Sequence, residues 1–135
     1  MTAHTSGLAI LVVEDDAIIA WDIAMQLRAL GYQTLGPAST GALAIELAGR
    51  MRPALVLMDI HLKGPMDGIT AAQVIRDDFD VPSVFLSAFA SDGGLARAAA
   101  ARPAGYVSKP FSEDELRRVV AGALGLAAQG QPPQA

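Results

Sequence analysis

The chain of 135 residues has no cysteine, few aromatic residues and no long hydrophobic run. Without cysteine it has no disulfide framework. No apolar run approaches the roughly 20 residues that a membrane-spanning helix needs, so we expect no membrane anchor. Residues 1–7 lack the basic start and the apolar stretch of a secretory signal. These absences favour a soluble, cytoplasmic protein.

Positive charge is also scarce. Ten Lys and Arg residues stand against 14 Asp and Glu residues, which gives a formal net charge of −4 and a pI near 4.9. A broad surface for nucleic-acid phosphates needs clustered Lys and Arg, so we expect no direct contact with DNA. A chain of this length can bury the core of one domain, and we expect no second folded domain.

Short apolar segments alternate with longer segments of helical periodicity. This pattern is typical of the α/β class, in which helices cover both faces of a parallel sheet. The expected strands are 9–13, 32–36, 54–58, 83–86 and 105–108, and the second, as the least apolar, is placed at an edge. The expected helices are one ending near Gly31, then 39–50, 68–78, 92–101 and 112–126.

The last expected helix has the clearest start signal in the chain. Ser112 and Glu115 have the spacing of a capping box, and Phe111 is placed to pack on Leu116. The segments 1–7 and 127–135 are polar and contain Gly or Pro, so we expect disordered tails around a domain of residues 8–126.

Polar residues follow four of the expected strands. Glu14 and Asp15 come after the first strand and Asp59 after the third. Ser87 comes after the fourth strand, and Lys109 follows the fifth. In an open parallel sheet, ligands bind outside the carboxyl ends of the strands. We therefore expect these side chains to share one pocket.

Clustered carboxylates repel one another, and a hard cation with oxygen ligands, such as Mg²⁺, relieves that repulsion. A metal beside a carboxylate, with a lysine and a hydroxyl to bind phosphoryl oxygens, is the equipment of phosphoryl transfer. Asp59 would then be the nucleophile.

Each residue taken alone has a simpler interpretation. Asp15 is typical of a helix start, where acids are favoured, and Asp16 is the expected N-cap. Asp59 alone is a turn aspartate, Lys109 a surface lysine and Ser87 a loop hydroxyl. Their joint placement favours the metal and phosphoryl site.

The blocks LVVEDD, LVLMDI, FLSA and YVSKPF, in this order and with these separations, resemble the signature blocks of response-regulator receiver domains over residues 8–126. The resemblance implies a flavodoxin-like (βα)5 fold, a doubly wound parallel sheet with strand order 2-1-3-4-5. It also implies a stand-alone receiver of two-component signalling.

Roles of individual residues follow from this resemblance. It implies that Asp15 ligates Mg²⁺ directly, that Glu14 acts through a coordinated water, and that Asp59 is both ligand and phosphoacceptor. It further implies that the backbone carbonyl of His61 completes the set and that Lys109 binds a phosphoryl oxygen.

The resemblance also implies a switch, in which Ser87 moves to the phosphoryl group and Tyr106 then turns inward. The peptide before Pro110 is expected to be cis. His61 and Phe89 would influence the lifetime of the phosphorylated form. The loop after Asp59 departs from the family, being one residue longer than the commonest form, with Lys63 and Gly64 where proline is frequent.

The resemblance predicts a phosphoacceptor supplied by a histidine kinase or histidine phosphotransfer protein, which promotes only its own phosphorylation and dephosphorylation. The output would be a protein contact through the fourth helix, fifth strand and fifth helix, with a second copy of the chain among the candidate partners. A small phosphohydrolase with an aspartate nucleophile is the alternative, but the second acid it needs is replaced by His61. A flavin mononucleotide carrier is disfavoured because three acids follow the first strand.

The remaining conspicuous side chains have plain interpretations. Trp21 and Met25 are expected to be packing residues of the first helix, with no cofactor implied. Four arginines are expected on solvated faces, namely Arg97, Arg102, Arg117 and Arg118.

Overall fold

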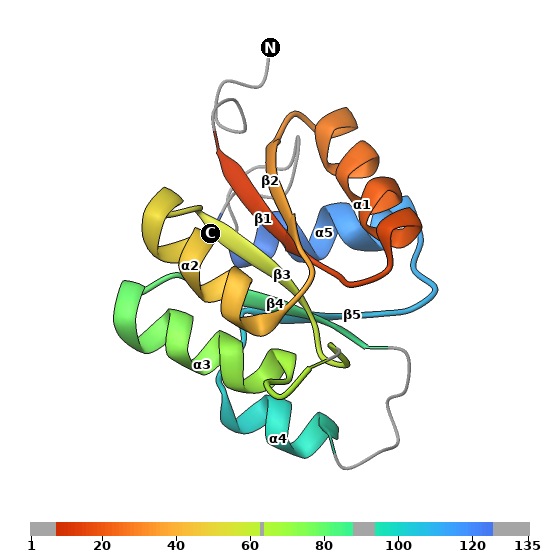
Figure 1. Ribbon diagram of the computed structural model, residues 1–135. Coiled ribbons are helices and arrows are strands. Elements are labelled where there is room, and N and C mark those ends of the chain that lie inside the picture. Colours follow the sequence, from red (N-terminus) through yellow and green to blue (C-terminus); the bar gives the residue numbers. More distant parts are fainter. Residues whose placement is uncertain (1–7, 63, 88–93, 126–135) are drawn as a thin grey trace.

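The computed structural model describes residues 8–62, 64–87 and 94–125, so the predictions for the two tails, Lys63 and Phe89 lie outside the described residues. Five parallel strands form one sheet in the order β2-β1-β3-β4-β5, which confirms the predicted topology (Figure 1). The strands are β1 (Ala9–Val13), β2 (Gln33–Ala38), β3 (Leu55–Asp59), β4 (Ser83–Ser87) and β5 (Gly105–Ser108). The helices are α1 (Ala17–Ala29), α2 (Gly41–Met51), α3 (Gly68–Phe79), α4 (Gly94–Ala100) and α5 (Glu113–Ala123).

Helices cover both faces of the sheet, with α1 and α5 on one side and α2 and α3 on the other (Figure 1). Successive strand residues point to opposite faces, so each central strand supplies both layers of the core. Ile10 and Val12 of β1 pack with α1 and α5, whereas Leu11 and Val13 pack with α2 and α3. Burial on both faces explains why β1, most of β3 and the middle of β4 are apolar.

Side-chain caps fix where several helices begin. Asp16 accepts hydrogen bonds from the backbone N–H groups of Ile18 and Ile19, which confirms it as the N-cap of α1. Ser112 accepts from the N–H of Glu115 at the start of α5, as the capping-box pattern predicts. Both caps lie at the edge of the sheet where the polar residues gather.

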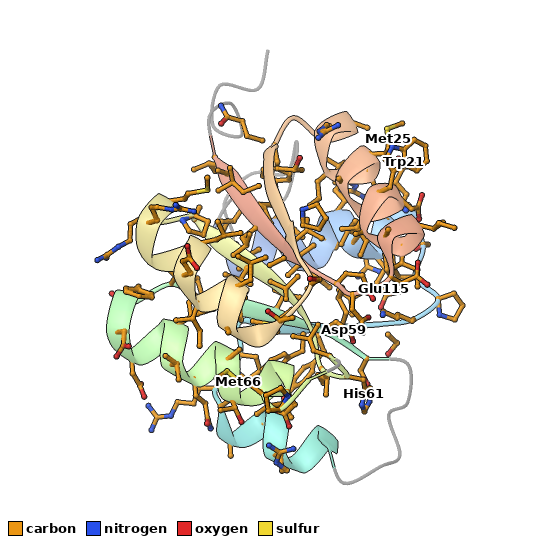
Figure 2. All side chains as sticks on the ribbon, viewed as in Figure 1. Trp21, Met25, Asp59, His61, Met66 and Glu115 are labelled. Carbon is orange, nitrogen blue, oxygen red and sulfur yellow. The ribbon has the colours of Figure 1, made fainter. Side chains whose placement is uncertain are left out.

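Two details of the sequence prediction need correction. Strand β2 continues to Ala38, two residues beyond the predicted end, because an edge position accommodates a proline within a strand. Trp21 and Met25 are not packed in the core, since 62% of Trp21 and 46% of Met25 are exposed. Both side chains lie on the outer side of α1 (Figure 2), while Ala20, Ile23 and Leu27 form its buried face.

Among the described helices, none combines the length and apolar character that a membrane crossing requires.

Candidate functional site

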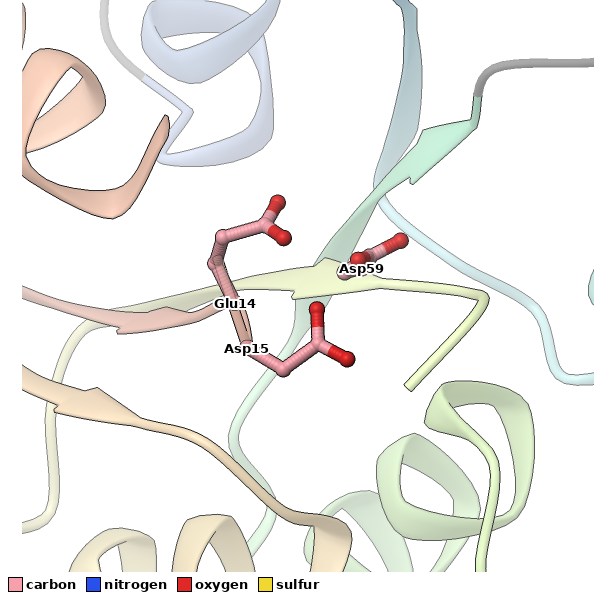
Figure 3. Close-up of side chains that lie close together, drawn as sticks. All are labelled: Glu14, Asp15 and Asp59. Carbon is pink, nitrogen blue, oxygen red and sulfur yellow. The ribbon is translucent and has the colours of Figure 1, made fainter. Parts of the chain in front are cut away.

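Three carboxylates converge beyond the ends of β1 and β3 (Figure 3). One oxygen from each of Glu14, Asp15 and Asp59 lies within 4.8 Å of the others. Glu14 and Asp59 are buried, and Asp15 is partly exposed. The structure therefore brings these three acids together, as the sequence predicts, while their roles stay predictions.

The register of the sheet explains this convergence. Val13 of β1 pairs with Met58 of β3, so the residues that follow them, Glu14 and Asp59, come out side by side. On the next strands Ser87 pairs with Ser108, and the backbone N–H of Lys109 donates to the carbonyl of Ser87 at 2.8 Å. Parallel pairing thus brings residues distant in sequence to one edge.

Lys109 lies between two of the carboxylates. Its Nζ is 2.8 Å from Glu14 Oε1 and 3.6 Å from Asp59 Oδ2. Burial alone would lower the pKa of Lys109, but the hydrogen bond and the charges of Glu14 and Asp59 outweigh it and raise this pKa. Lys109 is therefore charged at neutral pH, with Glu14 as its nearer partner.

The surroundings of the Glu14 carboxylate disfavour its charged form. Burial raises its pKa above the ordinary value, the Asp59 charge adds to this, and the hydrogen bonds from Lys109 and the Asp16 backbone oppose it only in part. Its Oε2 accepts from the N–H of Asp16 at 3.2 Å, so both oxygens are engaged. A cation bound beside Glu14 would favour its charged form.

The cluster fits a magnesium ion by its donor chemistry. All three side chains offer carboxylate oxygens, the donors that hard divalent cations take, and an Mg²⁺ site needs few protein ligands because the ion keeps several waters. His61 lies next to the cluster at the end of β3, where its backbone N–H donates to Asp59 Oδ1 at 3.0 Å (Figure 2). The role of its carbonyl as a ligand stays a prediction.

The two residues of the predicted switch lie on neighbouring strands. Ser87 ends β4 and is buried, with 7% of its surface exposed. Tyr106 of β5 is 37% exposed, and its ring centroid is 6.3 Å from that of Phe85, its partner across the strands. The Lys109–Pro110 peptide is cis, as the resemblance implies. The switching motion itself stays a prediction.

The connection from β3 to α3 contains two residues that the sequence analysis did not single out. Asp67 is the N-cap of α3 and accepts from the N–H of Thr70 at 2.9 Å. Gly68 lies very close to β3, since a Cβ at this position would lie 2.0 Å from the carbonyl oxygen of Asp59. The signal that could have revealed them is an Asp-Gly pair at a helix start.

Residues 10–121 match the family model described as the response regulator receiver domain. The chain belongs to this family. The receiver is similar to the transcriptional regulatory protein PdtaR of Mycobacterium tuberculosis, with 40% identity over 107 residues, covering 79% of this chain and 52% of PdtaR. It is also similar to the phyllosphere-induced regulator PhyR of Methylorubrum extorquens, with 31% identity over 116 residues, covering 85% of this chain and 43% of PhyR. The receiver thus spans about half the length of these curated relatives.

A solved structure adds a point about the metal. The receiver is similar to the receiver domain of the sensor histidine kinase PA1611 from Pseudomonas aeruginosa, with a TM-score of 0.80 and 33% identity, covering 89% of this chain and 99% of that one. That neighbour has a magnesium ion coordinated in its active-site cleft. The acidic cluster of this receiver is the group of described residues able to hold such an ion.

Proposed function

We propose that this receiver takes a phosphoryl group on Asp59 from a phosphohistidine of a histidine kinase or phosphotransfer protein, and that this changes a protein-binding face. The observation that carries the proposal is the surroundings of the Asp59 carboxylate, which shares an acidic cluster with Glu14 and Asp15 and lies 3.6 Å from Lys109 Nζ. Membership in the receiver family supports it.

In this transfer an oxygen of Asp59 forms a bond to phosphorus as the phosphorus–nitrogen bond of the donor breaks. The leaving imidazole nitrogen keeps the bonding electron pair and takes up a proton. Lys109 binds an oxygen of the incoming phosphoryl group, exchanging part of its contact with Glu14 for that contact. A bound Mg²⁺, held by Asp15 and Asp59 with Glu14 acting through water, would neutralise charge on the transferred group.

The response to phosphorylation would pass through Ser87 and Tyr106. We propose that the Ser87 hydroxyl binds the phosphoryl group and that Tyr106, now 37% exposed, turns into the space this vacates. The surface formed by α4, β5 and α5 would thereby shift between two populations, only one of which binds the downstream protein.

The donor protein would approach across α1. A groove of about 640 Å³ beside Lys109 is lined mainly by apolar side chains of α1 and the β5–α5 connection, namely Ile18, Ile19, Trp21, Pro110 and Phe111. Because Lys109 lines this groove and also contacts Asp59, a donor seated there would have its phosphohistidine next to the acceptor. Trp21→Ala should slow transfer from the donor protein and leave labelling by acetyl phosphate unchanged.

The deciding experiment is labelling by acetyl phosphate with Mg²⁺, followed by intact-protein mass spectrometry. We expect one phosphoryl group on the wild-type protein and none on Asp59→Asn, while Asp78→Asn, an exposed aspartate of α3, is labelled normally. Undiminished labelling of Asp59→Asn would refute the assignment. Multiple turnover of small phosphomonoesters would instead favour the phosphohydrolase alternative.

A further inference from the structure

Helix α4 has described side chains at residues 97–100. Among its described side chains only Ala98 is buried. Two polar contacts join the α4 region to α3: Arg97 Nη1 lies 2.8 Å from Asp67 Oδ2, and Arg76 Nη1 donates to the carbonyl of Arg102 at 3.3 Å. A polar cleft of about 430 Å³ lies beside the second contact, between α3 and the end of α4. Among the described side chains, two polar contacts thus join α4 and its C-terminal end to α3 and its N-cap.

The first of these contacts reaches the phosphorylation site through the backbone. Asp67 precedes Gly68, whose N–H donates to the carbonyl of Ile60 at 3.1 Å. The α-carbon of Gly68 lies so close to the Asp59 carbonyl that a Cβ there would meet it at 2.0 Å. A shift of the backbone at Asp59 and Ile60 would therefore act on Gly68 and on the adjacent Asp67, whose carboxylate contacts Arg97.

We propose that the Arg97–Asp67 ion pair ties α4 to the start of α3, which lies against the end of β3 that carries Asp59, so that the position of α4 and the occupancy of Asp59 influence each other. Arg97 and Asp67 are positioning residues, since neither touches the reacting atoms. The tie rests on the proposed function and runs along the α3 side of the site, separate from the route through Ser87 and Tyr106.

The direction of the effect follows from the arrangement that contains the ion pair. Tyr106 is exposed in this arrangement, which corresponds to the unphosphorylated form under the proposed function. The Arg97 and Asp67 side chains are 57% and 32% exposed, so the pair has the modest strength of a surface contact. Breaking it should favour the phosphorylated arrangement about two- to fivefold.

The test measures how tightly each variant binds beryllofluoride with Mg²⁺, where beryllofluoride stands in for the phosphoryl group on Asp59. The variants are Arg97→Gln, Asp67→Asn, which keeps a side chain able to cap α3, and the double variant. We expect each single variant to bind about two- to fivefold more tightly, and the double variant to match the singles because both remove one contact. Arg97→Lys, which keeps the charge, should stay near wild type.

Arg50→Gln is the matched control, since Arg50 forms an exposed ion pair with Glu46 on α2, outside the surface formed by α4, β5 and α5. It should leave beryllofluoride binding unchanged. NMR provides a second readout, which a purely structural role of Arg97 would not change. Beryllofluoride should change the amide chemical shift of Ala98 in the wild type, and should change it less in Arg97→Gln.

The two levels of the proposal fail in different ways. One outcome would overturn the tie alone. In it the wild-type protein binds beryllofluoride, and either Arg97→Gln and Asp67→Asn bind it with the same affinity as the wild type or their effects on affinity add up in the double variant. A wild-type protein that neither binds beryllofluoride nor accepts phosphate on Asp59 would overturn the proposed function and the tie with it.

Discussion

Two ion pairs flank Asp59, and in each the nitrogen and oxygen are 2.8 Å apart. On one side Lys109 meets Glu14, and these side chains are 19% and 2% exposed. On the other side Arg97 meets Asp67, and these side chains are 57% and 32% exposed. Equal distances therefore occur in very different surroundings.

Burial, and not distance, determines how much each pair contributes to stability. Removing one member of a buried pair leaves a charge without water or partner, which costs about 3–5 kcal/mol. An exposed pair exchanges its contact for water at a cost of at most about 1 kcal/mol. We therefore expect the Lys109–Glu14 pair to contribute more to stability than the Arg97–Asp67 pair.

Lys109→Met should show the largest effect. It should lower the free energy of unfolding by about 3 kcal/mol in metal-free buffer at neutral pH, because the buried Glu14 carboxylate loses its nearer partner. Urea unfolding measures this. The double variant Glu14→Gln/Lys109→Met should recover part of the loss, since no unpaired charge remains. If Lys109→Met were as stable as Arg97→Gln, the buried pair would contribute no more to stability than the exposed pair, which would contradict this prediction.

Two glycine substitutions, one at the start of α3 beside Asp59 and one on α5, should change the stability of the protein in opposite directions. Gly68→Ala should destabilise the protein by about 2 kcal/mol, because the new Cβ would collide with the Asp59 carbonyl, a backbone atom. Gly122→Ala on α5 should stabilise it by about 0.5 kcal/mol, because nothing lies within 4 Å of that position and alanine favours a helix. Thermal or urea unfolding of both variants should give opposite signs, and equal signs would contradict this.

The positions of many residues of the candidate site could be predicted from sequence, because strand topology determines them. Once the apolar segments are read as parallel strands, Glu14, Asp59 and Lys109 must come out at one edge of the sheet. The caps at Asp16 and Ser112 were also predictable, since a cap depends on residues within one turn of itself. Local chemistry and strand order both leave clear marks in the sequence.

The remaining features depend on contacts that sequence spacing does not record. Trp21 and Met25 were taken for packing residues because α1 carries apolar side chains around much of its circumference, so periodicity does not reveal which side faces the sheet. The Arg97–Asp67 pair joins residues 30 positions apart through the angle at which α4 lies on α3. The contact of Gly68 with Asp59 likewise depends on how closely α3 approaches β3.

The pH dependence of Mg²⁺ binding should test the role of Glu14, the buried partner of Lys109. Because burial raises the pKa of Glu14, this group takes up a proton at higher pH than an ordinary glutamate. Its ionised form costs folding stability, so metal-free protein should lose stability as pH rises through this pKa, and Mg²⁺ should offset the loss.

Binding of Mg²⁺ should accordingly weaken as pH falls through the same pKa, by at most about tenfold per pH unit. Urea unfolding with and without Mg²⁺ over about pH 5 to 8 would measure this. In Glu14→Gln the acid-range dependence should flatten, and a wild type as flat as this variant would exclude Glu14 as the responsible group.

Arg97→Gln should lower the free energy of unfolding by only about 0.5 kcal/mol at neutral pH and low salt. Burial alone would raise the pKa of Asp67, but the backbone N–H of Thr70 and the Arg97 guanidinium lower it below the ordinary value. A carboxylate with a lowered pKa contributes stability above its unfolded pKa and loses it as pH falls through the folded one. The difference between wild type and Arg97→Gln should therefore vanish at acid pH, and also in about 1 M salt, where exposed charges are screened. A difference that survives both conditions would mean that Arg97 stabilises α4 by packing and not by its charge, which would contradict the interpretation of this pair as an exposed ion pair.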